Sequence, residues 1–208
     1  MRTIIMEDII RSRRSIRSYL QKEVSQEIIL RLIDVARWAP SAHNAQPWRF
    51  ILITDSDAKR RLAEAMASDW MRDLEKNGVP KEEIEKLTGE SIKRFSEAPV
   101  LIVAAVTMRD MHKYSDRRRQ RFERLMATQS LAAAIQNILL AAHAEGLGAC
   151  WFCAPLFCQE TVRRVLRMPR DVEPQALITV GYPAERPDPP PRKPLKEIVF
   201  KNYWGVSL

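Results

Sequence analysis

Hydrophobic positions along this chain follow two periods, one typical of helices and one typical of strands. Apolar residues at helical spacing begin after Ser25, which suits a helix N-cap, and stop before Pro40, so a helix is expected between them. Residues 48–54 combine aromatic and branched side chains and predict a strand. Residues 99–106 are apolar without interruption, which is typical of a strand buried on both faces near the centre of a sheet.

The middle of the chain predicts mainly helices. Two charged helices are expected from about Asp57 to Ser96, separated by a turn at 77–80, and they predict a peripheral hairpin. The longest helix is expected over about 122–145. It is rich in alanine and apolar on more than one face, so it belongs in the core or at a large interface. The other elements that the pattern predicts are a strand at 150–153, a helix at 159–167 and a strand at 176–181.

The C-terminal part differs in composition. Proline dominates residues 183–194 and predicts an extended segment. Residues 198–208 are too apolar for a free tail and are expected to pack on their own domain or on a partner subunit. The 208 residues are expected to form one domain, 1–208, with a proline-rich extension at about 183–208.

Charge and cysteine content narrow the function classes. A formal charge of +8 implies attraction to anions, which include nucleotide cofactors, acidic substrates, nucleic acid and membrane surfaces. The first eight residues contain no apolar run of signal-peptide length, and the apolar stretch at 131–144 is too short to span a bilayer, so neither secretion nor membrane insertion is expected. Three clustered cysteines argue against a disulfide framework and favour the cytoplasm.

A cationic cluster lies near the start of the chain. If residues 13–18 are helical, Arg13 and Arg17 share one face, with Arg14 beside them. Guanidinium groups bind a phosphate monoester through paired, charge-assisted hydrogen bonds, and the hydroxyl of Ser15 can meet a further oxygen. The alternative for these residues alone is a solvated basic turn.

Four segments occur in the order and spacing of a known family. They are Arg13–Tyr19, Ala39–Trp48, Glu145–Trp151 and Val180–Pro183. With them, about residues 7–200 of the chain resemble the FMN-dependent nitroreductase family. This resemblance implies an α+β fold: a nitroreductase-like three-layer α/β/α sandwich with a mixed, mainly antiparallel sheet, in an intertwined homodimer. It also implies FMN at two sites between the subunits.

The resemblance also implies roles for individual residues. Arg13, Arg14 and Ser15 would hold the phosphate and ribityl end of FMN, and Arg17 would reach the pyrimidine edge of the ring, where a cation stabilises the reduced flavin. No side chain is expected to be catalytic in its own right. The remaining implied contacts are Pro40, Ser41, Asn44 and Gln46 from the other subunit, the small-residue turn Cys153, Ala154 and Pro155, and the basic pair Arg192 and Lys193.

Other motifs give weaker evidence of a functional site. Cys150 and Cys153 have metal-site spacing but lack four ligands, so buried small hydrophobic residues are the better interpretation, and no metal site is predicted. Gly146-Leu-Gly148 lacks the third glycine of a dinucleotide fingerprint and precedes a strand, so no Rossmann site is expected. His43 and His143 are given no catalytic role.

The predicted function is an FMN-dependent oxidoreductase that passes hydride from NADH or NADPH to a nitroaromatic, quinone or conjugated carbonyl compound. Residues 150–158 and 173–177 look like the nitroreductase-type domain of deazaflavin-coenzyme glutamyl ligases, so a reductase of a deazaflavin precursor is one alternative. A basic nucleic-acid-binding protein and a flavin store or sensor are the others. The basic cluster at Arg117–Arg121 is interpreted as a solvated face or the rim of an anionic-substrate site, because interleaved aromatic residues are scarce there.

Overall fold

The structure is a computed structural model and describes residues 6–206. The absence of a signal peptide was predicted from residues 1–8, which lie partly outside this range. The last two residues of the apolar C-terminal segment also lie outside it. A four-stranded antiparallel sheet forms the middle layer, in the order β1-β2-β4-β3. The strands are β1 (Trp48–Ile53), β2 (Val100–Thr107), β3 (Gly148–Phe152) and β4 (Val172–Gly181).

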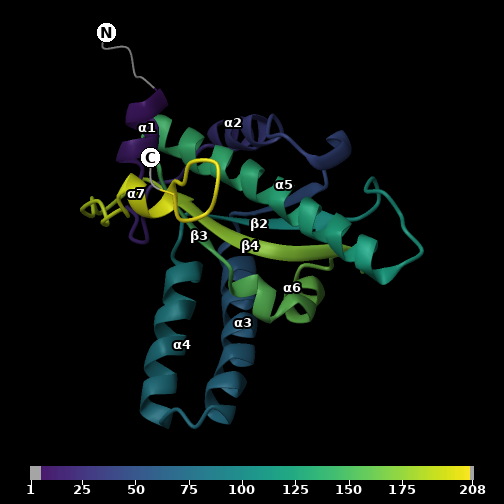
Figure 1. The fold of residues 1–208 in the computed structure, drawn as a ribbon. Helices are drawn as coiled ribbons and strands as arrows, with labels where there is room; N and C mark the ends of the chain where they lie inside the picture. The colour runs from purple at the N-terminus through teal and green to yellow at the C-terminus, as the bar shows by residue number, and fades with distance from the viewer. Residues whose placement is uncertain (1–5, 207–208) are drawn as a thin grey trace.

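Helices cover both faces of this sheet, as Figure 1 shows. One face carries α2 (Gln26–Ala36) and α5 (Arg117–Ala144), and the other carries α3 (Ser56–Lys76), α4 (Lys81–Ser96) and α6 (Gln159–Val165). The predicted three-layer sandwich is therefore confirmed. The short helices are α1 (Met6–Ser12), α7 (Leu195–Ile198) and the 3-10 turns η1 (Ala42–Asn44) and η2 (Ala154–Phe157).

Strand β2 holds the two outer layers together. All eight of its residues are buried, as the uninterrupted apolar run predicted. Ile102, Ala104 and Val106 face α2 and α5, whereas Leu101 and Val103 face the layer of α3, α4 and α6. Because successive side chains of a strand point to opposite faces, this one strand contributes to both cores.

The predicted hairpin of α3 and α4 is confirmed, and Figure 1 shows that it projects from the sheet. Its base is not peripheral. Leu62 and Met66 of α3 and Phe95 of α4 are buried against the sheet. The buried Lys59 Nζ donates to the carbonyl of Ala98 over 2.7 Å, which ties α3 to the start of β2.

Helix α5 begins at Arg117, five residues before the predicted start. Asp116 is its N-cap and accepts a hydrogen bond from the backbone N–H of Arg119, over 2.8 Å. The basic cluster Arg117–Arg121 is therefore the first turn of α5. By length and composition alone, this 28-residue helix could cross a membrane. It lies across the sheet with nine of its described residues buried, so it is the core helix of the fold.

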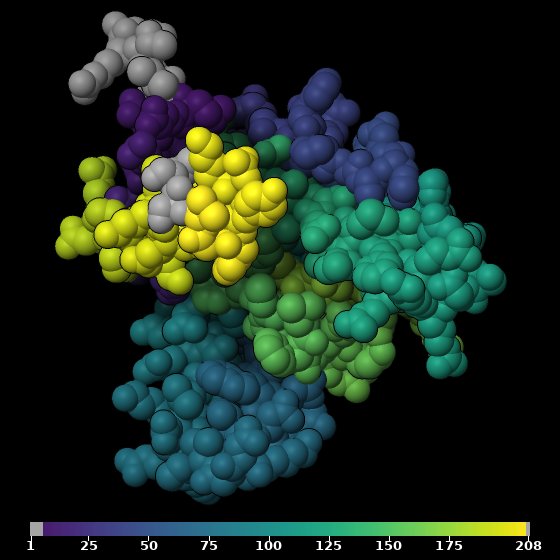
Figure 2. All heavy atoms as spheres, viewed as in Figure 1, coloured from purple at the N-terminus to yellow at the C-terminus, as the bar shows by residue number. Residues whose placement is uncertain are grey.

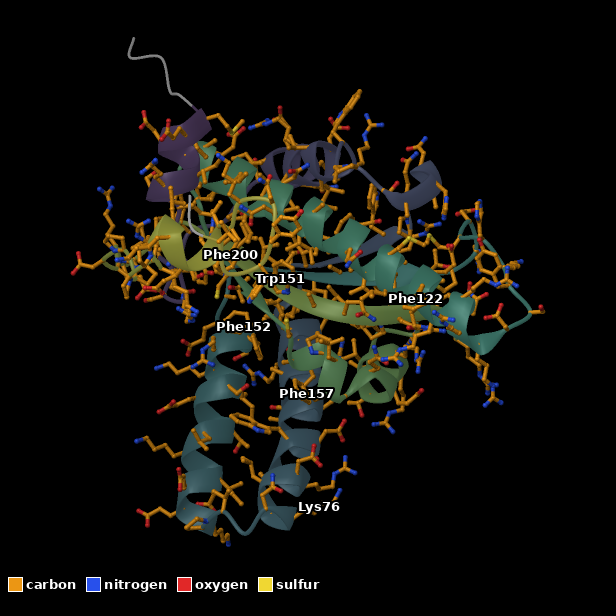
Figure 3. All side chains as sticks on the ribbon, viewed as in Figure 1. Lys76, Phe122, Trp151, Phe152, Phe157 and Phe200 are labelled. Atoms are coloured by element: carbon orange, nitrogen blue, oxygen red, sulfur yellow. The ribbon has the colours of Figure 1, made fainter. Side chains whose placement is uncertain are left out.

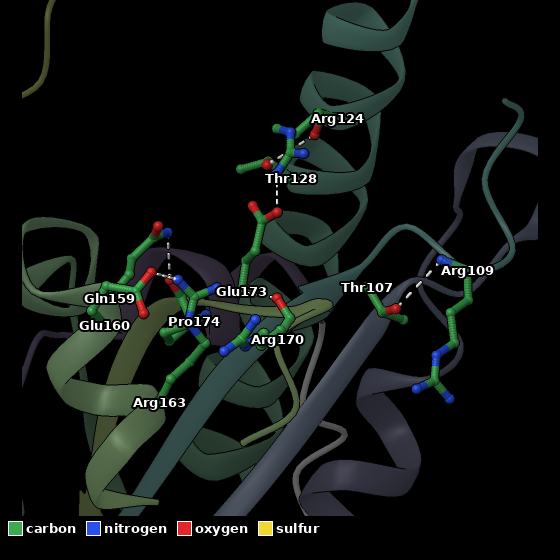
Figure 4. Close-up of polar contacts among 10 residues, drawn as sticks. All are labelled: Thr107, Arg109, Arg124, Thr128, Gln159, Glu160, Arg163, Arg170, Glu173 and Pro174. Atoms are coloured by element: carbon green, nitrogen blue, oxygen red, sulfur yellow. Dashed lines mark hydrogen bonds and ion pairs between the residues drawn. The ribbon is translucent and has the colours of Figure 1, made fainter. Parts of the chain in front are cut away.

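Strand β4 begins four residues before its predicted start because Pro174 is tolerated there. Strand β3 pairs with β4 only from Leu177 onward, so residue 174 lies on an edge where a missing N–H costs little. Figure 4 shows how this end of β4 is fastened: Glu173 pairs with Arg124 of α5, and Gln159 Nε2 donates to the carbonyl of Pro174 over 3.0 Å.

Residues 13–18 are not helical, so the helical arrangement considered for the arginine cluster is wrong. Helix α1 ends at Ser12, and the chain then runs extended beside β3. Ser15 forms a parallel bridge with Ala149, and the N–H of Ile16 donates to the carbonyl of Ala149 over 3.0 Å. This bridge gives the antiparallel sheet its one parallel pairing among the described residues. The partner of this segment lies more than 130 residues away, where local spacing cannot reveal it.

Residues 183–194 form the predicted extended segment, without helix or strand apart from a single bridge at Pro183. The apolar residues beyond it do not all pack on their own chain, because Trp204 is 88% exposed and Tyr203 is also exposed. Figure 2 shows this C-terminal segment as a raised lobe on the face of the molecule. Packing on a partner subunit stays a prediction.

A glycine makes the close approach between Ile16 and β3 possible. A Cβ placed on Gly148 would lie 2.7 Å from Cβ of Ile16, closer than side chains tolerate. We expect Gly148→Ala to lower the free energy of unfolding by about 1–3 kcal/mol, because Ile16 and its segment must shift. Urea unfolding checks this value.

Gly89 provides the matched control. It lies on the exposed face of α4, and a Cβ there meets nothing within 4 Å. Gly89→Ala is expected to raise stability by up to about 1 kcal/mol, because alanine is the better helix former. Equal effects of the two substitutions would contradict the steric explanation.

Candidate functional site

The three arginines of residues 13–19, here called the arginine segment, form no ion pair within the part of the chain that the structure describes. Arg13 and Arg14 are half-buried, and Arg14 Nη1 donates only to backbone carbonyls, those of Arg11 and Arg13. The Nε atoms of both side chains are buried and have no hydrogen-bond partner among the described residues. Buried donors are normally paired, so this pair of atoms indicates a site for an acceptor.

Arg17 is exposed and held by its backbone. The N–H groups of Arg17 and Ser18 both donate to Glu185 Oε1, over 2.6 and 3.1 Å. The carbonyl of Ser18 accepts from the N–H of Ala184 over 3.0 Å. The start of the proline-rich segment therefore fixes the course of the arginine segment.

Tyr19 fastens the same segment to the sheet. Its hydroxyl lies 2.5 Å from the carbonyl oxygen of Ile16 and 2.6 Å from Oγ1 of Thr179. Burial raises the pKa of this phenol, so it remains a neutral hydrogen-bonding group. The arginines are thus presented by a backbone that is rigidly placed.

His143 lies beside the two half-buried arginines. Its Nε2 is 2.7 Å from Oγ of Ser12, at the last turn of α5. Burial, and then the charges of Arg13 and Arg14, lower the pKa of this imidazole below its usual value. The ring is therefore neutral at physiological pH, and the arginines supply the positive charge at this end of the molecule.

Two clefts lie beside the hairpin and share Arg94 of α4, and the smaller one also includes residues 17–19 of the arginine segment. The larger, of about 610 Å³, lies between the hairpin and η2 and includes Phe152 and Phe157, which Figure 3 labels. The smaller, of about 300 Å³, is lined by the cations Arg17, Lys93 and Arg94 and also by the carboxylates Glu90 and Glu97. The Arg94 guanidinium carbon lies 5.9 Å from the centre of the Phe152 ring. We call the two clefts together the hairpin hollow; its cations lie among several carboxylates and beside the aromatic rings of Phe152 and Phe157.

Lys93 and Arg94 give no distinctive signal in the sequence. They lie in the last turn of a charged helix, where basic residues are common for reasons of helix stability alone. Only the packing of the hairpin base against the sheet reveals that they face Arg17.

The small-residue turn leads out of β3 toward the larger cleft. Ala154 lines this cleft, Pro155 is buried, and the N–H of Leu156 donates to the carbonyl of Cys153 over 3.0 Å. Cys153 is exposed, so the interpretation of this cysteine as a buried hydrophobic residue is wrong. The strand ends at Phe152, and Cys153 is the first residue of the turn.

Cys150 is buried, as predicted, and Cys158 is buried as well. Burial raises the pKa of Cys150, although Arg17 and Arg13 oppose this effect, and burial raises the pKa of Cys158 to about 11. All three cysteines are free.

The segment Pro40–Gln46 is a tightly constrained loop around η1. The N–H of Ala42 donates to Oγ of Ser130 in α5 over 3.2 Å, and Ser41 Oγ accepts from the N–H of Gln46 over 3.1 Å. His43, Asn44 and Gln46 have positive φ angles of 58°, 51° and 45°. Few residues adopt this conformation without a fixed environment, so the loop presents its side chains in one arrangement.

The two predicted groups do not meet within one chain. The loop contacts α5 at Glu123 and Ser130, and the arginine segment adjoins His143 near the other end of the helix. His143 is thirteen residues from Ser130 and twenty from Glu123, which corresponds to roughly 20–30 Å at 1.5 Å per residue. Figure 1 shows the same separation, with α1 at one end of the molecule and the loop after α2 near the other.

The basic pair near the C-terminus is exposed. Arg192 Nη1 donates to the carbonyls of Pro190 and Pro191, over 3.2 Å each. Lys193 follows in the same extended stretch. Among the described residues, neither side chain forms a hydrogen bond with Arg13–Arg17.

Known proteins resemble this chain along nearly its whole length. The model of the nitroreductase family matches residues 10–182. YfhC of Bacillus subtilis, provisionally named an NAD(P)H nitroreductase, is 28% identical over 93% of this chain and 92% of its own.

Two solved structures extend the comparison. A BluB-like flavoprotein from Clostridium difficile has a TM-score of 0.80 at 25% identity, covering 96% of this chain and 100% of its own. A protein from Desulfovibrio desulfuricans, provisionally named a nitroreductase and solved in complex with FMN, has a TM-score of 0.72 at 27% identity, covering 98% and 99%. The family expected from the four sequence motifs is therefore confirmed: this chain belongs to the nitroreductase family.

Proposed function

We propose that two copies of this chain form a homodimeric FMN-dependent enzyme that uses NADH or NADPH to reduce a small organic acceptor. As a member of the nitroreductase family, the chain is an oxidoreductase. The observation that supports the proposal most strongly is the separation of the two motif segments by roughly 20–30 Å along α5. A flavin site that uses both segments needs a second chain.

The arginine segment fits the phosphate end of FMN. Arg13 and Arg14 each carry a buried Nε without a partner among the described residues, and Ser15 adds a hydroxyl on the same strand edge. Arg192 and Lys193, at the end of a segment whose start is fixed beside Arg17, would complete this site. Charge-assisted hydrogen bonds to phosphate would satisfy the unpaired donors.

The hairpin hollow would hold the flavin ring. When bound, FMN supplies the redox chemistry, accepting hydride from the nicotinamide donor and passing it to a nitroaromatic, quinone or conjugated carbonyl acceptor. Arg17 would lie at the pyrimidine edge and stabilise negative charge there. Arg94 and Lys93 line the same hollow and would reinforce this field. Ala154 lines the larger cleft. With its neighbours Cys153 and Pro155 it would form the wall beside the ring, where small side chains permit close approach.

The second subunit would cover this site with Pro40, Ser41, Asn44 and Gln46. Exposed apolar side chains on α2 and α5 support such an association: Leu30, Val35, Phe122, Leu125 and, just beyond α2, Trp38, which is 76% exposed. A dimer that buries these helices would place the loop of one chain near the arginines of the other.

The remaining expectations follow from this assignment. The 208 residues would act as a single domain with an extension at 183–208, in the cytoplasm, where the three free cysteines stay reduced. Reduction of a deazaflavin precursor stays the alternative among substrates. The nucleic-acid alternative explains only the charge, whereas the flavin assignment also accounts for the constrained loop at 40–46.

The direct test is an absorbance spectrum of the purified protein, followed by anaerobic reduction with NADH and with NADPH. Oxidised flavin bands that bleach with one or both donors are expected. A colourless protein that takes up no added FMN would contradict the assignment.

Arg13→Ala is expected to raise the Kd for FMN by about 10- to 100-fold, since it removes a charge-assisted phosphate contact. Fluorescence titration with FMN measures this change. The matched control is Arg11→Ala, which removes the same charge two residues earlier from a side chain that pairs with Glu7 on the surface. Equal loss of FMN affinity in both variants would indicate a general effect of charge and contradict a specific contact between Arg13 and the phosphate.

Subunit sharing can be tested with two defective chains. We expect Arg13→Ala/Arg17→Ala and Ser41→Ala/Asn44→Ala each to lose flavin as homodimers. A heterodimer of the two, isolated with different affinity tags after coexpression, contains one intact site and should recover about half of the wild-type flavin per dimer. A heterodimer without flavin would show that one chain supplies both segments.

Thiol reactivity reports on the turn beside the proposed ring. Cys153 is exposed and should react first with iodoacetamide, whereas Cys150 and Cys158 should resist, because burial hinders access and raises their pKa values. Added FMN is expected to slow the reaction at Cys153, measured by peptide mass spectrometry. An unchanged rate would contradict the proposal that this turn lies beside bound FMN.

A further inference from the structure

A second cluster of polar side chains lies apart from the arginine segment. His43 of η1, His112 of the segment between β2 and α5, and Glu123 in the second turn of α5 meet on one side of the long helix. Their potential ligand atoms all lie within 4.8 Å of one another. Three segments of the chain therefore converge on one point with two imidazoles and one carboxylate.

The geometry suits a metal ion. His43 Nε2 lies 3.2 Å from Glu123 Oε1, and the rings of His43 and His112 stack with centroids 3.7 Å apart and an angle of 18°. Ligand atoms of tetrahedral Zn²⁺, with bonds of about 2.0–2.1 Å, are about 3.3 Å apart. The pair of His43 and Glu123 already has this spacing. Stacked rings direct their nitrogen lone pairs side by side, so His112 must leave the stack and turn its nitrogen toward the ion, and its exposed position leaves room for that rotation.

The carboxylate provides an independent reason for a cation. The side chain of Glu123 is only 3% exposed, and its Oε2 is buried without a hydrogen-bond partner in the part of the chain that the structure describes. A buried carboxylate with one oxygen unpaired is costly in free energy. A metal ion bound between Glu123 and the two imidazoles would compensate for this cost.

Two of the arginines at this end of α5 are paired with carboxylates. Arg119 pairs with Asp116 and also lies over the ring of Tyr114, and Arg124 pairs with Glu173. The Glu123 carboxylate remains as the buried negative charge at the meeting point of the two rings.

We propose that His43, His112 and Glu123 form a binding site for a divalent transition metal of the Zn²⁺ type. Three protein ligands leave one position open for water or for an oxygen atom of a bound molecule. The ion joins η1, the segment before α5 and α5 itself, so it fixes the backbone of the loop that contains Asn44. This site does not depend on the flavin assignment, because none of its ligands lies among the proposed FMN contacts.

The test uses Co²⁺ as a visible probe and Zn²⁺ as its competitor. The full-length protein is treated with a chelator, dialysed, and titrated with Co²⁺. We expect one ion per chain, with the intense visible absorption of tetrahedral cobalt, which added Zn²⁺ abolishes. Absence of any binding by the wild-type protein would overturn the proposal.

His112→Ala is the decisive variant because this side chain is exposed and its loss should leave the fold intact. It should weaken Zn²⁺ binding at least about tenfold. His143→Ala is the control, since His143 is the only other histidine in the chain and lies at the far end of α5. Unchanged Zn²⁺ affinity in His112→Ala, or equal loss in His143→Ala, would contradict the proposed ligand set.

The flavin content of each variant is measured alongside. His112→Ala is expected to retain FMN, so loss of metal with flavin retained separates this site from the cofactor site. A thermal melt with and without Zn²⁺ gives a second readout, because an ion that binds only the folded chain raises Tm. A wild-type Tm that does not respond to Zn²⁺, or an equal response in His112→Ala, would count against the site.

Discussion

The packing of α5 across the sheet is the constraint on which the other features depend. Leu131, Ile135 and Ile138 are buried against the face of the sheet that Ile102 and Ala104 of β2 present. Because protein cores are close-packed, a helix that is buried along this much of its length cannot slide or rotate freely. Whatever is attached to α5 therefore has a fixed place.

Each functional segment is attached to a different point of this helix. Ser130 holds the backbone of η1, Glu123 holds His43, and His143 contacts Ser12 at the end of α1. The helix thus sets the distance between the loop and the arginines. A dimer built on exposed faces of α2 and α5 would inherit this distance, so the geometry of a shared site would follow from the core of each subunit.

The sequence predicted features that depend on local periodicity. The strand at 99–106, the hairpin at 57–96 and the core position of the longest helix each leave a pattern within one segment, and each is present. The four motifs also identified the family correctly. Boundaries were less accurate where a single residue decides them, as Asp116 does by capping α5 ahead of four arginines.

The features that the sequence could not reveal depend on contacts between distant segments. The extended course of residues 13–18 follows from pairing with Ala149, and the position of Arg94 beside Arg17 follows from hairpin packing. His112 drew no attention because its partners lie 69 residues before it and 11 residues after it. Cys153 is exposed because β3 ends at Phe152, and the apolar residues around Cys153 give no sign of that end in the sequence.

The electrostatics of the arginine end depend on pH through His143. Its pKa lies below the value of about 6.5 that it would have in the unfolded chain, so the unfolded state binds the proton more readily. His143 therefore contributes to stability above this pH, and its contribution is lost as the pH falls below it. At neutral pH the imidazole of His143 is uncharged, so the positive charge beside it comes from Arg13 and Arg14 alone.

The proline-rich segment has a mechanical consequence. Pro194 has φ −64° and ψ 150°, the angles of a polyproline helix, and proline restricts the backbone even when the segment is undocked. The stretch from 183 to 194 therefore behaves as a semi-rigid spacer, and ordering it against another surface costs less conformational entropy than ordering a glycine-rich chain of the same length. Glu185 fixes the start of this spacer at the backbone of Arg17. The spacer therefore restricts the exposed side chains of Tyr203 and Trp204 to a limited range of distances from Arg17.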